Sequence, residues 1–170
     1  MNNLPKVTLR AIEPEDLDFL YRIENDRQLW DIGATNVPYS RYALHEYVAN
    51  ASTDIYTDKQ VRLIIEDEQH EAIGLADLTN FDPRHLRAEI GLVIVKSQRG
   101  KHLAHSALLK LHDYAEHTLR LHQIYAVIGS ENMAAIQLFK KMGYDISLPM
   151  KDWIFDGNCY QNALLLQKIL

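Results

Sequence analysis

The sequence predicts a mixed α/β fold, in which helices cover both faces of one mixed sheet. Two observations predict this fold. Strand patterns dominate the first half of the chain after two helical segments, and helical crossovers join the later strands. The chain has 170 residues, 47% hydrophobic and 24% charged, enough for one domain with a real core. We therefore expect residues 1–170 to form a single domain.

The first third of the chain is expected to hold one strand and two helices. Apolar and polar residues alternate over Val7–Ile12, which is typical of a strand. Pro14 and the acids around it favour the start of a helix, and Ser40 is suited to cap a second helix that ends near Ala51. Residues 25–39 lack a clean period and are expected to form a loop. The residues expected to pack are Leu17, Leu20, Tyr21, Ile23, Leu44, Tyr47 and Val48.

The middle of the chain predicts three strands and one long helix. Two strands, Val61–Glu66 and Ile73–Phe81, flank the polar turn Asp67–Glu71, and a second turn follows at Asp82–His85. A third strand, Ile90–Val95, leads through a short loop, Lys96–Lys101, into an amphipathic helix. The buried face of that helix is expected to consist of Leu103, Ala107, Leu108, Leu111, Tyr114 and Ala115.

The last part of the chain is expected to form a strand at Ile124–Ile128 and a helix at Asn132–Met142, which Gly143 would end. The strands Asp152–Phe155 and Tyr160–Leu166 flank Asp156-Gly157-Asn158, a strong signal for a hairpin turn.

The loop Lys96–Lys101 predicts an anion site. It contains Gly100 and opens a helix, so free backbone N–H groups and the positive end of the helix dipole point at whatever is bound there. The apolar strand before the loop offers a wall for the rest of the ligand. A phosphate-bearing ligand fits this arrangement.

Overall charge and cysteine content exclude other classes. The net charge of −5 at pH 7 disfavours nucleic acid as a partner, and a single cysteine, Cys159, rules out an internal disulfide. No apolar run approaches a membrane span or a signal core, so we expect no membrane partner and a cytoplasmic location.

Four segments in order resemble the GNAT superfamily of acetyl-CoA-dependent N-acetyltransferases, and most of all its spermidine and ribosomal-protein N-terminal branch. They are LRAIEPEDLDFLYRIEND, AEIGLVIVKSQRGKHLA, ENMAAIQLFKKMGY and IFDGNCYQNALLL. The resemblance implies a GNAT-like fold, with a mostly antiparallel sheet that splays between its fourth and fifth strands. It also implies transfer of an acetyl group from acetyl-CoA to a primary amine, by direct attack in a ternary complex. The amine could be a small amine, a polyamine or a protein N-terminus.

The resemblance places acetyl-CoA along the third strand of the middle region and the loop after it. The implied contacts are Leu92, Val93 and Ile94 for the pantetheine arm, Arg99, Gly100, Lys101, His102, Leu103, Ala104 and His105 for the pyrophosphate, Asn132 for the pantetheine or its phosphate, and Lys140 or Lys141 for the nucleotide. Two residues depart from the family pattern. His102 stands where relatives have a small residue, and Ser97 stands where they often have glutamine.

The resemblance implies that Glu89 is the candidate catalytic base, because it stands at the start of the central strand, where the family often places a carboxylate near the amine. A base is useful because the attacking amine must lose a proton, and an alkyl ammonium group has a pKa near ~10. A backbone N–H near Val93 or Ile94 would polarise the thioester carbonyl. The alternative for Glu89 is a solvated carboxylate or an ion pair with Arg87.

The proton donor for the leaving thiolate is the open question. Many relatives have tyrosine where this chain has Phe139, so unaided departure, water or another hydroxyl must serve instead. The candidate hydroxyl groups are Tyr125, Tyr144, Tyr160 and Ser130. Phe139 also favours the alternative function, an acyl-CoA-binding or sensing module with little or no turnover.

The acceptor pocket is expected to include Trp30 and Tyr39. Spermidine enzymes carry several glutamates after their first helix, whereas this chain keeps only Asp31 and Glu46 and adds Arg41, which counts against spermidine. One ammonium group could still be bound by Glu24, Asp26 and Asp31.

The remaining motifs carry less chemistry. His102, His105 and His112 share a helix, but no carboxylate or cysteine completes a ligand set, so no metal is expected. Cys159 has no paired base in the sequence and is not expected to act as a nucleophile. A homo-oligomer is open, because the terminal hairpin offers strand edges.

Overall fold

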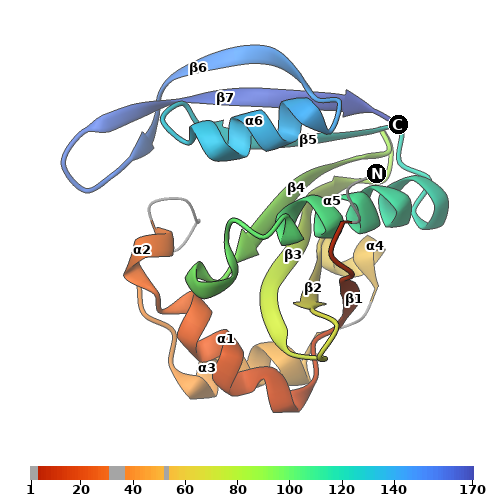
Figure 1. The fold of residues 1–170 in the computed structure, drawn as a ribbon, viewed down its shortest axis with the longest axis vertical. Helices are drawn as coiled ribbons and strands as arrows, with labels where there is room; N and C mark the ends of the chain where they lie inside the picture. Colours follow the sequence, from red (N-terminus) through yellow and green to blue (C-terminus); the bar gives the residue numbers. More distant parts are fainter. Residues whose placement is uncertain (1–3, 31–36, 52–53) are drawn as a thin grey trace. The chain divides into compact units, whose positions relative to one another are not determined.

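A computed structural model describes residues 4–30, 37–51 and 54–170. Its seven strands form one sheet in the order β1-β2-β3-β4-β5-β7-β6 (Figure 1). The strands are β1 (Thr8–Ala11), β2 (Val61–Glu66), β3 (Ala72–Asp82), β4 (Arg87–Ile94), β5 (Gln123–Gly129), β6 (Asp145–Phe155) and β7 (Tyr160–Ile169). The helices are α1 (Leu17–Glu24), α2 (Arg27–Trp30), α3 (Arg41–Ala49), α4 (Ile55–Asp58), α5 (Leu103–Asp113) and α6 (Met133–Lys141).

The chain divides into two compact units. One contains residues 1–12, 52–126 and 168–170, and the other contains residues 13–51 and 127–167. The first unit therefore holds β1 to β4 and α5, and the second holds α1, α3 and α6 with most of the final hairpin.

The sheet is mixed, as the sequence predicts. β1 to β4 pair antiparallel in sequence order, and β6 pairs antiparallel with β7. β4 pairs with β5 in parallel, in a register that covers only Arg87–Glu89 against Gln123–Tyr125. No register pair joins β4 to β5 beyond Glu89 in the part of the chain that the structure describes, which is what the predicted splay between these strands requires.

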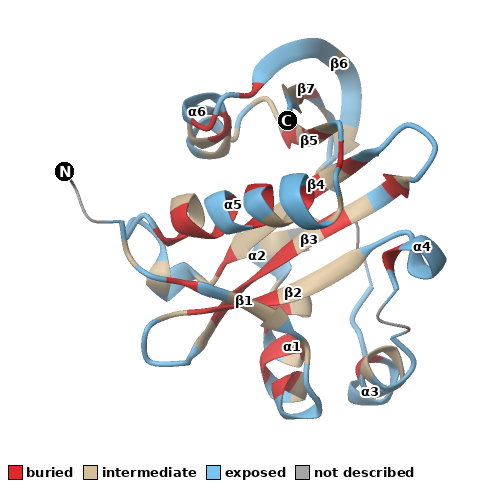
Figure 2. Ribbon diagram, turned by 90° about the vertical axis from the view of Figure 1, so that its right-hand side faces the viewer, coloured by how far each residue is buried: buried red, intermediate tan, exposed pale blue. Residues whose placement is uncertain are grey.

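The core of the first unit lies between α5 and the sheet, because α5 contacts β1, β3 and β4. The predicted apolar face of α5 is confirmed: Leu103, Ala107, Leu108, Leu111 and Ala115 are buried, and Tyr114 is half-buried (Figure 2). In the sheet, the β-branched residues Ile64, Ile65 and Ile73 are at most 1% exposed. Ile64 and Ile65 are adjacent on β2 and point to opposite faces, so both faces of the sheet are buried there. After Asp113 the helix widens into a π turn over Tyr114–Thr118, where the N–H of Leu119 bonds the carbonyl of Tyr114.

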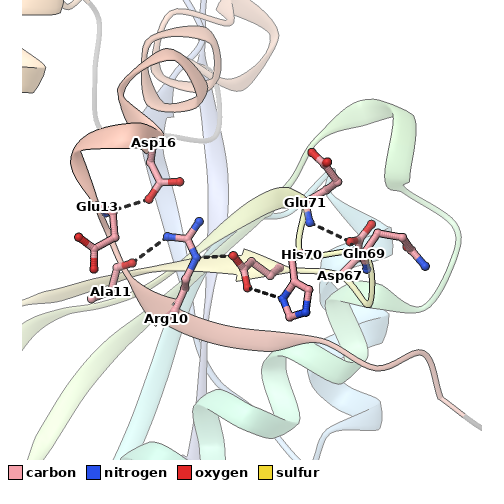
Figure 3. Close-up of polar contacts among 9 residues, drawn as sticks. Arg10, Ala11, Glu13, Asp16, Asp67, Gln69, His70 and Glu71 are labelled. Atoms are coloured by element: carbon pink, nitrogen blue, oxygen red, sulfur yellow. Dashed lines mark hydrogen bonds and ion pairs between the residues drawn. The ribbon is translucent and has the colours of Figure 1, made fainter.

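An ion pair between Arg10 and Glu66 links β1 to β2 (Figure 3). Glu66 is buried, and its second oxygen lies 3.5 Å from Nδ1 of His70. The hydrogen bond from Arg10 holds the pKa of the Glu66 carboxyl below its ordinary value, against the opposing effect of burial. The predicted turn after β2 is confirmed, since Oδ1 of Asp67 accepts hydrogen bonds from the N–H groups of Gln69 and Glu71 at 2.9 and 3.1 Å.

In the second unit, two predicted helix starts are confirmed. Pro14 opens a 3-10 turn that runs into α1, and Ser40 caps α3 by accepting a hydrogen bond from the N–H of Ala43 at 3.0 Å. The predicted packing holds in part. Leu20, Ile23 and Leu44 are buried, Leu17, Tyr21, Tyr47 and Val48 are half-buried, and Phe19 joins the core although the sequence analysis did not select it.

Several boundaries differ from the prediction. The expected loop 25–39 contains the short helix α2, and α4 was not predicted; each has only four residues, too few to show a helical period. β4 begins three residues earlier than expected. β6 begins at Asp145, earlier than the expected Asp152. The added segment is mostly exposed, so no alternating pattern marks it, and it contains Pro149, which an edge strand tolerates. Gly143 (φ 87°) and Gly157 (φ 97°) take the left-handed conformations predicted for a helix end and a hairpin turn.

Candidate active site

β4 carries the residues expected to line the pantetheine arm. Leu92 and Val93 are half-buried and Ile94 is buried. One edge of this segment pairs with β3, where Leu92, Val93 and Ile94 face Ala76, Leu75 and Gly74. The other edge has no strand partner among the described residues, so its backbone groups can serve a ligand that carries amides.

Gly74 brings β3 unusually close to β4. A Cβ atom built on Gly74 would lie 2.2 Å from the carbonyl oxygen of Val93, closer than any real contact of that kind. Only glycine allows this approach, so Gly74 helps to fix the position of the strand that is expected to bind the pantetheine arm.

The loop after β4 is held by its own side chains. Nε of Arg99 donates a hydrogen bond to the carbonyl of Ile94 at 2.9 Å, and Nζ of Lys101 donates to Oε1 of Gln98 at 2.7 Å. The N–H of Gln98 also bonds the carbonyl of Val95 at 2.9 Å. Arg99 and Lys101, both predicted to contact pyrophosphate, shape the loop through these hydrogen bonds. Both residues are exposed, so their positive charges lie at the surface.

The start of α5 has the geometry of an anion site. Gly100 takes φ 78°, and the space where its side chain would lie is open. His102 takes φ 61° at the N-cap, and its side chain makes no capping hydrogen bond. His102 is exposed, and its side chain does not occupy the backbone N–H groups at the start of the helix. Leu103 is buried, whereas Ala104 and His105 are half-buried.

Glu89 is half-buried on β4, three residues before Leu92. Its Oε2 atom accepts a hydrogen bond from Nδ2 of Asn80 at 2.8 Å. The alternative partner considered for Glu89 is engaged elsewhere, because Arg87 pairs with Asp82 at 3.1 Å. Asn80 was not predicted as a site residue, because no motif in the sequence marks it.

The second unit positions Asn132 at the N-cap of α6. Its Oδ1 atom accepts a hydrogen bond from the N–H of Ala135 at 3.2 Å, so the side chain has a structural role there. Lys140 and Lys141 are exposed in the last turn of α6. The expected ligand contacts of Asn132 and Lys141 stay predictions.

Phe139 is buried inside the second unit, where its ring meets that of Tyr144 edge-on at 4.8 Å. Burial raises the pKa of the Tyr144 phenol, which makes that group a weaker acid and disfavours it as the proton donor for the thiolate. Tyr160 is exposed on the hairpin and contacts the ring of Phe155. Of the candidate hydroxyl groups, Tyr125 is the one that lies beside Glu89 in the sheet.

The expected acceptor residues fall in the second unit. The side chain of Trp30, and Asp31, lie outside the described residues. Tyr39 is 37% exposed, and Asn25 holds its backbone by two hydrogen bonds, of 2.8 Å from the Tyr39 N–H and 3.0 Å to its carbonyl. Arg41 pairs with Asp18 and lies 4.4 Å above the ring of Tyr21, so a neighbouring carboxylate balances its positive charge.

Metal binding and a nucleophilic Cys159 are the two other chemistries that the sequence raised. No group of three or more histidine, cysteine, aspartate or glutamate residues is placed to hold a metal ion in the part of the chain that is described. At Cys159, the hydrogen bond to Asp156 raises the pKa of the thiol, which disfavours the nucleophilic thiolate. None of the described helices is long and apolar enough to cross a membrane.

A family model described as an acetyltransferase (GNAT) domain matches residues 6–145. The match includes the strand, loop and helix start described above. The chain belongs to the GNAT acetyltransferases. The expected family, fold and enzyme class are therefore confirmed: this GNAT protein is an acetyl-CoA-dependent N-acetyltransferase.

Relatives of this GNAT enzyme are similar along nearly all of its length. Spermidine N(1)-acetyltransferase from Vibrio cholerae serotype O1 is 30% identical over 93% of this chain and 90% of the relative. The crystal structure of spermidine N-acetyltransferase from Vibrio cholerae in complex with CoA and spermine has a TM-score of 0.85 at 28% identity, covering 96% of this chain and 95% of that one. A dodecameric structure of the Vibrio cholerae enzyme in an intermediate state has a TM-score of 0.82 at 28% identity, covering 96% and 93%.

Proposed function

We propose that this enzyme transfers the acetyl group of acetyl-CoA to a primary amine of a polyamine. The observation that carries the proposal is the likeness, over nine-tenths of the chain, to enzymes named for spermidine acetylation. The net charge of −5 favours a cationic substrate over an anionic one.

The structure weakens the objection that the sequence raised against a polyamine. Arg41 appeared to replace favourable acidic charge with a repulsive cation, but Asp18 pairs with it. The paired guanidinium therefore repels an ammonium group much less than an unpaired one would. Glu24 and Asp26 of the same unit remain our proposed acidic contacts for one ammonium group of the substrate.

The proposed binding mode places the pantetheine arm along Leu92–Ile94 and the pyrophosphate at the loop 99–105. Three observations support it: the strand edge without a partner, the open space at Gly100, and the helix start that His102 leaves uncapped. Glu89 would accept the proton of the ammonium group, directly or through water, so that the neutral amine attacks the thioester carbon. Backbone N–H groups near Val93 or Ile94 would polarise the carbonyl. The thiolate would leave with the electron pair of the C–S bond, and the proton that the nitrogen loses after the C–N bond forms would pass to the thiolate or to water.

Thiol release across a panel of amines tests this proposal. The panel should contain spermidine, spermine, putrescine, a lysine peptide and a peptide with a free N-terminus. We expect the highest kcat/KM for spermidine or spermine. A clear preference for either peptide would contradict a polyamine as the substrate.

One specific residue favours the alternative, an acyl-CoA-binding module with little turnover, because Phe139 lacks the exchangeable proton of the usual tyrosine. A thermal-shift titration with acetyl-CoA separates the two functions. Stabilisation by acetyl-CoA without thiol release from any amine would indicate the binding module. In that case Phe139→Tyr should raise turnover if a missing donor limits it, and an unchanged rate with intact binding would exclude that cause.

We also propose that the chain self-associates through the hairpin β6–β7. β6 is an edge strand of 11 residues, and it exposes Trp153 (60%) and Phe155 (57%) along with Ile146 and Leu148. Long apolar edges are normally covered in solution. Light scattering on the wild type and on Trp153→Lys tests this. We expect an oligomer that Trp153→Lys weakens, and a monomeric wild type would refute the proposal.

A further inference from the structure

Three strands of the first unit bring a group of polar side chains together around Glu89. In the sheet register Glu89 faces Thr79 of β3 on one side and Tyr125 of β5 on the other. The parallel pairing of β4 and β5 ends at this pair. Glu89 therefore lies at the last point where all three strands are joined, next to the strand edge proposed to bind the cofactor.

A bulge in β3 delivers a third polar side chain to the same place. The register shifts between Thr79 and Asp82, so that Asn80 and Phe81 together oppose one residue of β4. Asn80 takes the left-handed conformation, φ 50°, which asparagine tolerates better than most residues. The bulge leaves Asn80 exposed and Phe81 buried.

The bulge is anchored from the other side by α4. The N–H of Phe81 leaves the strand ladder and bonds the carbonyl of Lys59 at 3.0 Å. The Phe81 ring meets that of Tyr56 edge-on, with centroids 5.1 Å apart. This packing fixes the backbone that carries Asn80, so the orientation of its side chain is set by the fold.

The Asn80 amide is the group that joins the polar side chains. Its Nδ2 donates to Oε2 of Glu89 at 2.8 Å, and its side chain also hydrogen-bonds Tyr125. Burial, and then the Glu89 carboxylate, raise the pKa of the Tyr125 phenol, with Arg87 and Asn80 opposing them. Tyr125 is therefore a neutral phenol at neutral pH, next to the proposed base.

The nearby guanidinium of Arg87 does not hold the Glu89 carboxylate, because it is engaged elsewhere. Arg87 pairs with Asp82, whose carboxylate also accepts hydrogen bonds from the N–H groups of Arg84 and His85 at 3.0 and 3.1 Å. Asp82 thus closes the turn between β3 and β4 and keeps Arg87 on it. The Glu89 carboxylate is oriented by an uncharged donor, which leaves its negative charge available to attract an ammonium group.

We propose that Asn80 is a positioning residue for the acetyl transfer, which holds the Glu89 carboxylate in place beside the Tyr125 hydroxyl. This inference rests on the proposed function, because it takes Glu89 to be the base. Glu89 accepts the proton that the ammonium group loses before its nitrogen attacks the thioester and forms the C–N bond. Asn80 touches neither substrate nor cofactor in this scheme and acts only by orienting Glu89.

Asn80→Gly is the most direct variant, because glycine keeps the left-handed backbone and removes the side chain that bonds Glu89 and Tyr125. Leu86→Gly is the matched control: Leu86 also has a positive φ, of 48°, is exposed, and lies in the same connection between β3 and β4. We expect Asn80→Gly to lower kcat by about tenfold and to leave the KM for acetyl-CoA within about twofold. Leu86→Gly should keep the wild-type kcat, and both variants should retain similar Tm values.

The double variant with Glu89→Gln shows whether Asn80 acts through Glu89. We expect Glu89→Gln alone to lower kcat by about a hundredfold or more, and Asn80→Gly to add no further loss in that background. A wild-type kcat in Asn80→Gly, or an equal loss in both backgrounds, overturns the positioning role and leaves the proposed function intact. A wild-type kcat in Glu89→Gln, or a wild-type enzyme that releases no thiol, overturns the proposed chemistry and the positioning role together.

Discussion

His102 holds a left-handed backbone conformation, φ 61°, at the start of α5. The left-handed conformation costs an L-residue with a Cβ atom roughly 1–2 kcal/mol of folding stability, whereas glycine adopts it without this cost. Glycine also makes the unfolded chain more flexible, which returns part of that gain. We expect His102→Gly to stabilise the protein by about 0.5–1 kcal/mol, which a Tm higher by about 1–4 °C would show.

His102→Ala is the control, because it removes the imidazole but keeps the Cβ atom. We expect its Tm to remain at or below that of the wild type. Acetyl-CoA titrations of both variants then show whether the ring itself obstructs the pyrophosphate. A Tm gain of the same size in His102→Ala would mean that the imidazole, and not the backbone, causes the strain.

Cys159 is exposed at the tip of the final hairpin, but its thiol donates a hydrogen bond to Oδ2 of Asp156 at 3.4 Å. That bond raises the pKa of the thiol, so less thiolate is present at mildly alkaline pH. We expect iodoacetamide to react more slowly with the folded protein than with the chain in urea. Asp156→Asn keeps an acceptor for the turn and removes the charge, so alkylation should accelerate by about threefold or more. Equal alkylation rates in the folded wild type and in folded Asp156→Asn would contradict this role of Asp156.

β3 and β4 approach each other so closely at Gly74 that a side chain does not fit there. A side chain on Gly74 would meet the Val93 carbonyl, whereas a Cβ on Gly91 would lie an ordinary 3.5 Å from Asp77 Cβ. We expect Gly74→Ala to cost about 3 kcal/mol, and Gly91→Ala to stay within about 1 kcal/mol of the wild type. Urea unfolding of the two variants checks this, and similar midpoints would refute it.

Elements with a strong period were predictable from the sequence. The apolar face of α5 and the strands β2 and β3 follow from the spacing of their hydrophobic residues, since burial on one face leaves that spacing in the sequence. α2 and α4 are too short to leave such a pattern. β6 is exposed along nearly its full length, so nothing in its composition reflects a buried face.

The candidate site was predictable only where a backbone pattern marks it. Gly100 and the helix after it predict an anion site, and the resemblance to the family points to Glu89 through its place at the start of the strand. Asn80 could not be found in this way, because it reaches Glu89 only through a bulge that shifts the register by one residue. A bulge depends on tertiary contacts, here the bond from Phe81 to Lys59, that lie far away in the sequence.

At the scale of the whole molecule, Glu66 and His112 are two buried ionisable groups whose shifted pKa values make stability depend on pH. Glu66 has a lowered pKa, so its contribution is present above its ordinary value of 4.5 and is lost as pH falls through the lower folded value. His112 also has a lowered pKa, at about 4, because burial and the nearby Lys168 cation both disfavour the imidazolium. Its contribution is complete above the ordinary value of 6.5 and is lost as pH falls from there towards 4.

The two groups can be separated, because His112 acts in a range where Glu66 is still ionised. Unfolding in urea between pH 7 and about pH 5.5, above the ordinary pKa of Glu66, should show a loss of about 1 kcal/mol that is due to His112. His112→Gln has no proton to gain and keeps an acceptor for Lys168, whose Nζ lies 3.3 Å from the His112 ring. We expect that variant to hold a constant free energy of unfolding over this range and to lose stability only below it. His122→Gln, at an exposed histidine of the same unit, should keep the wild-type slope. The same slope in His112→Gln as in the wild type would exclude a buried neutral His112.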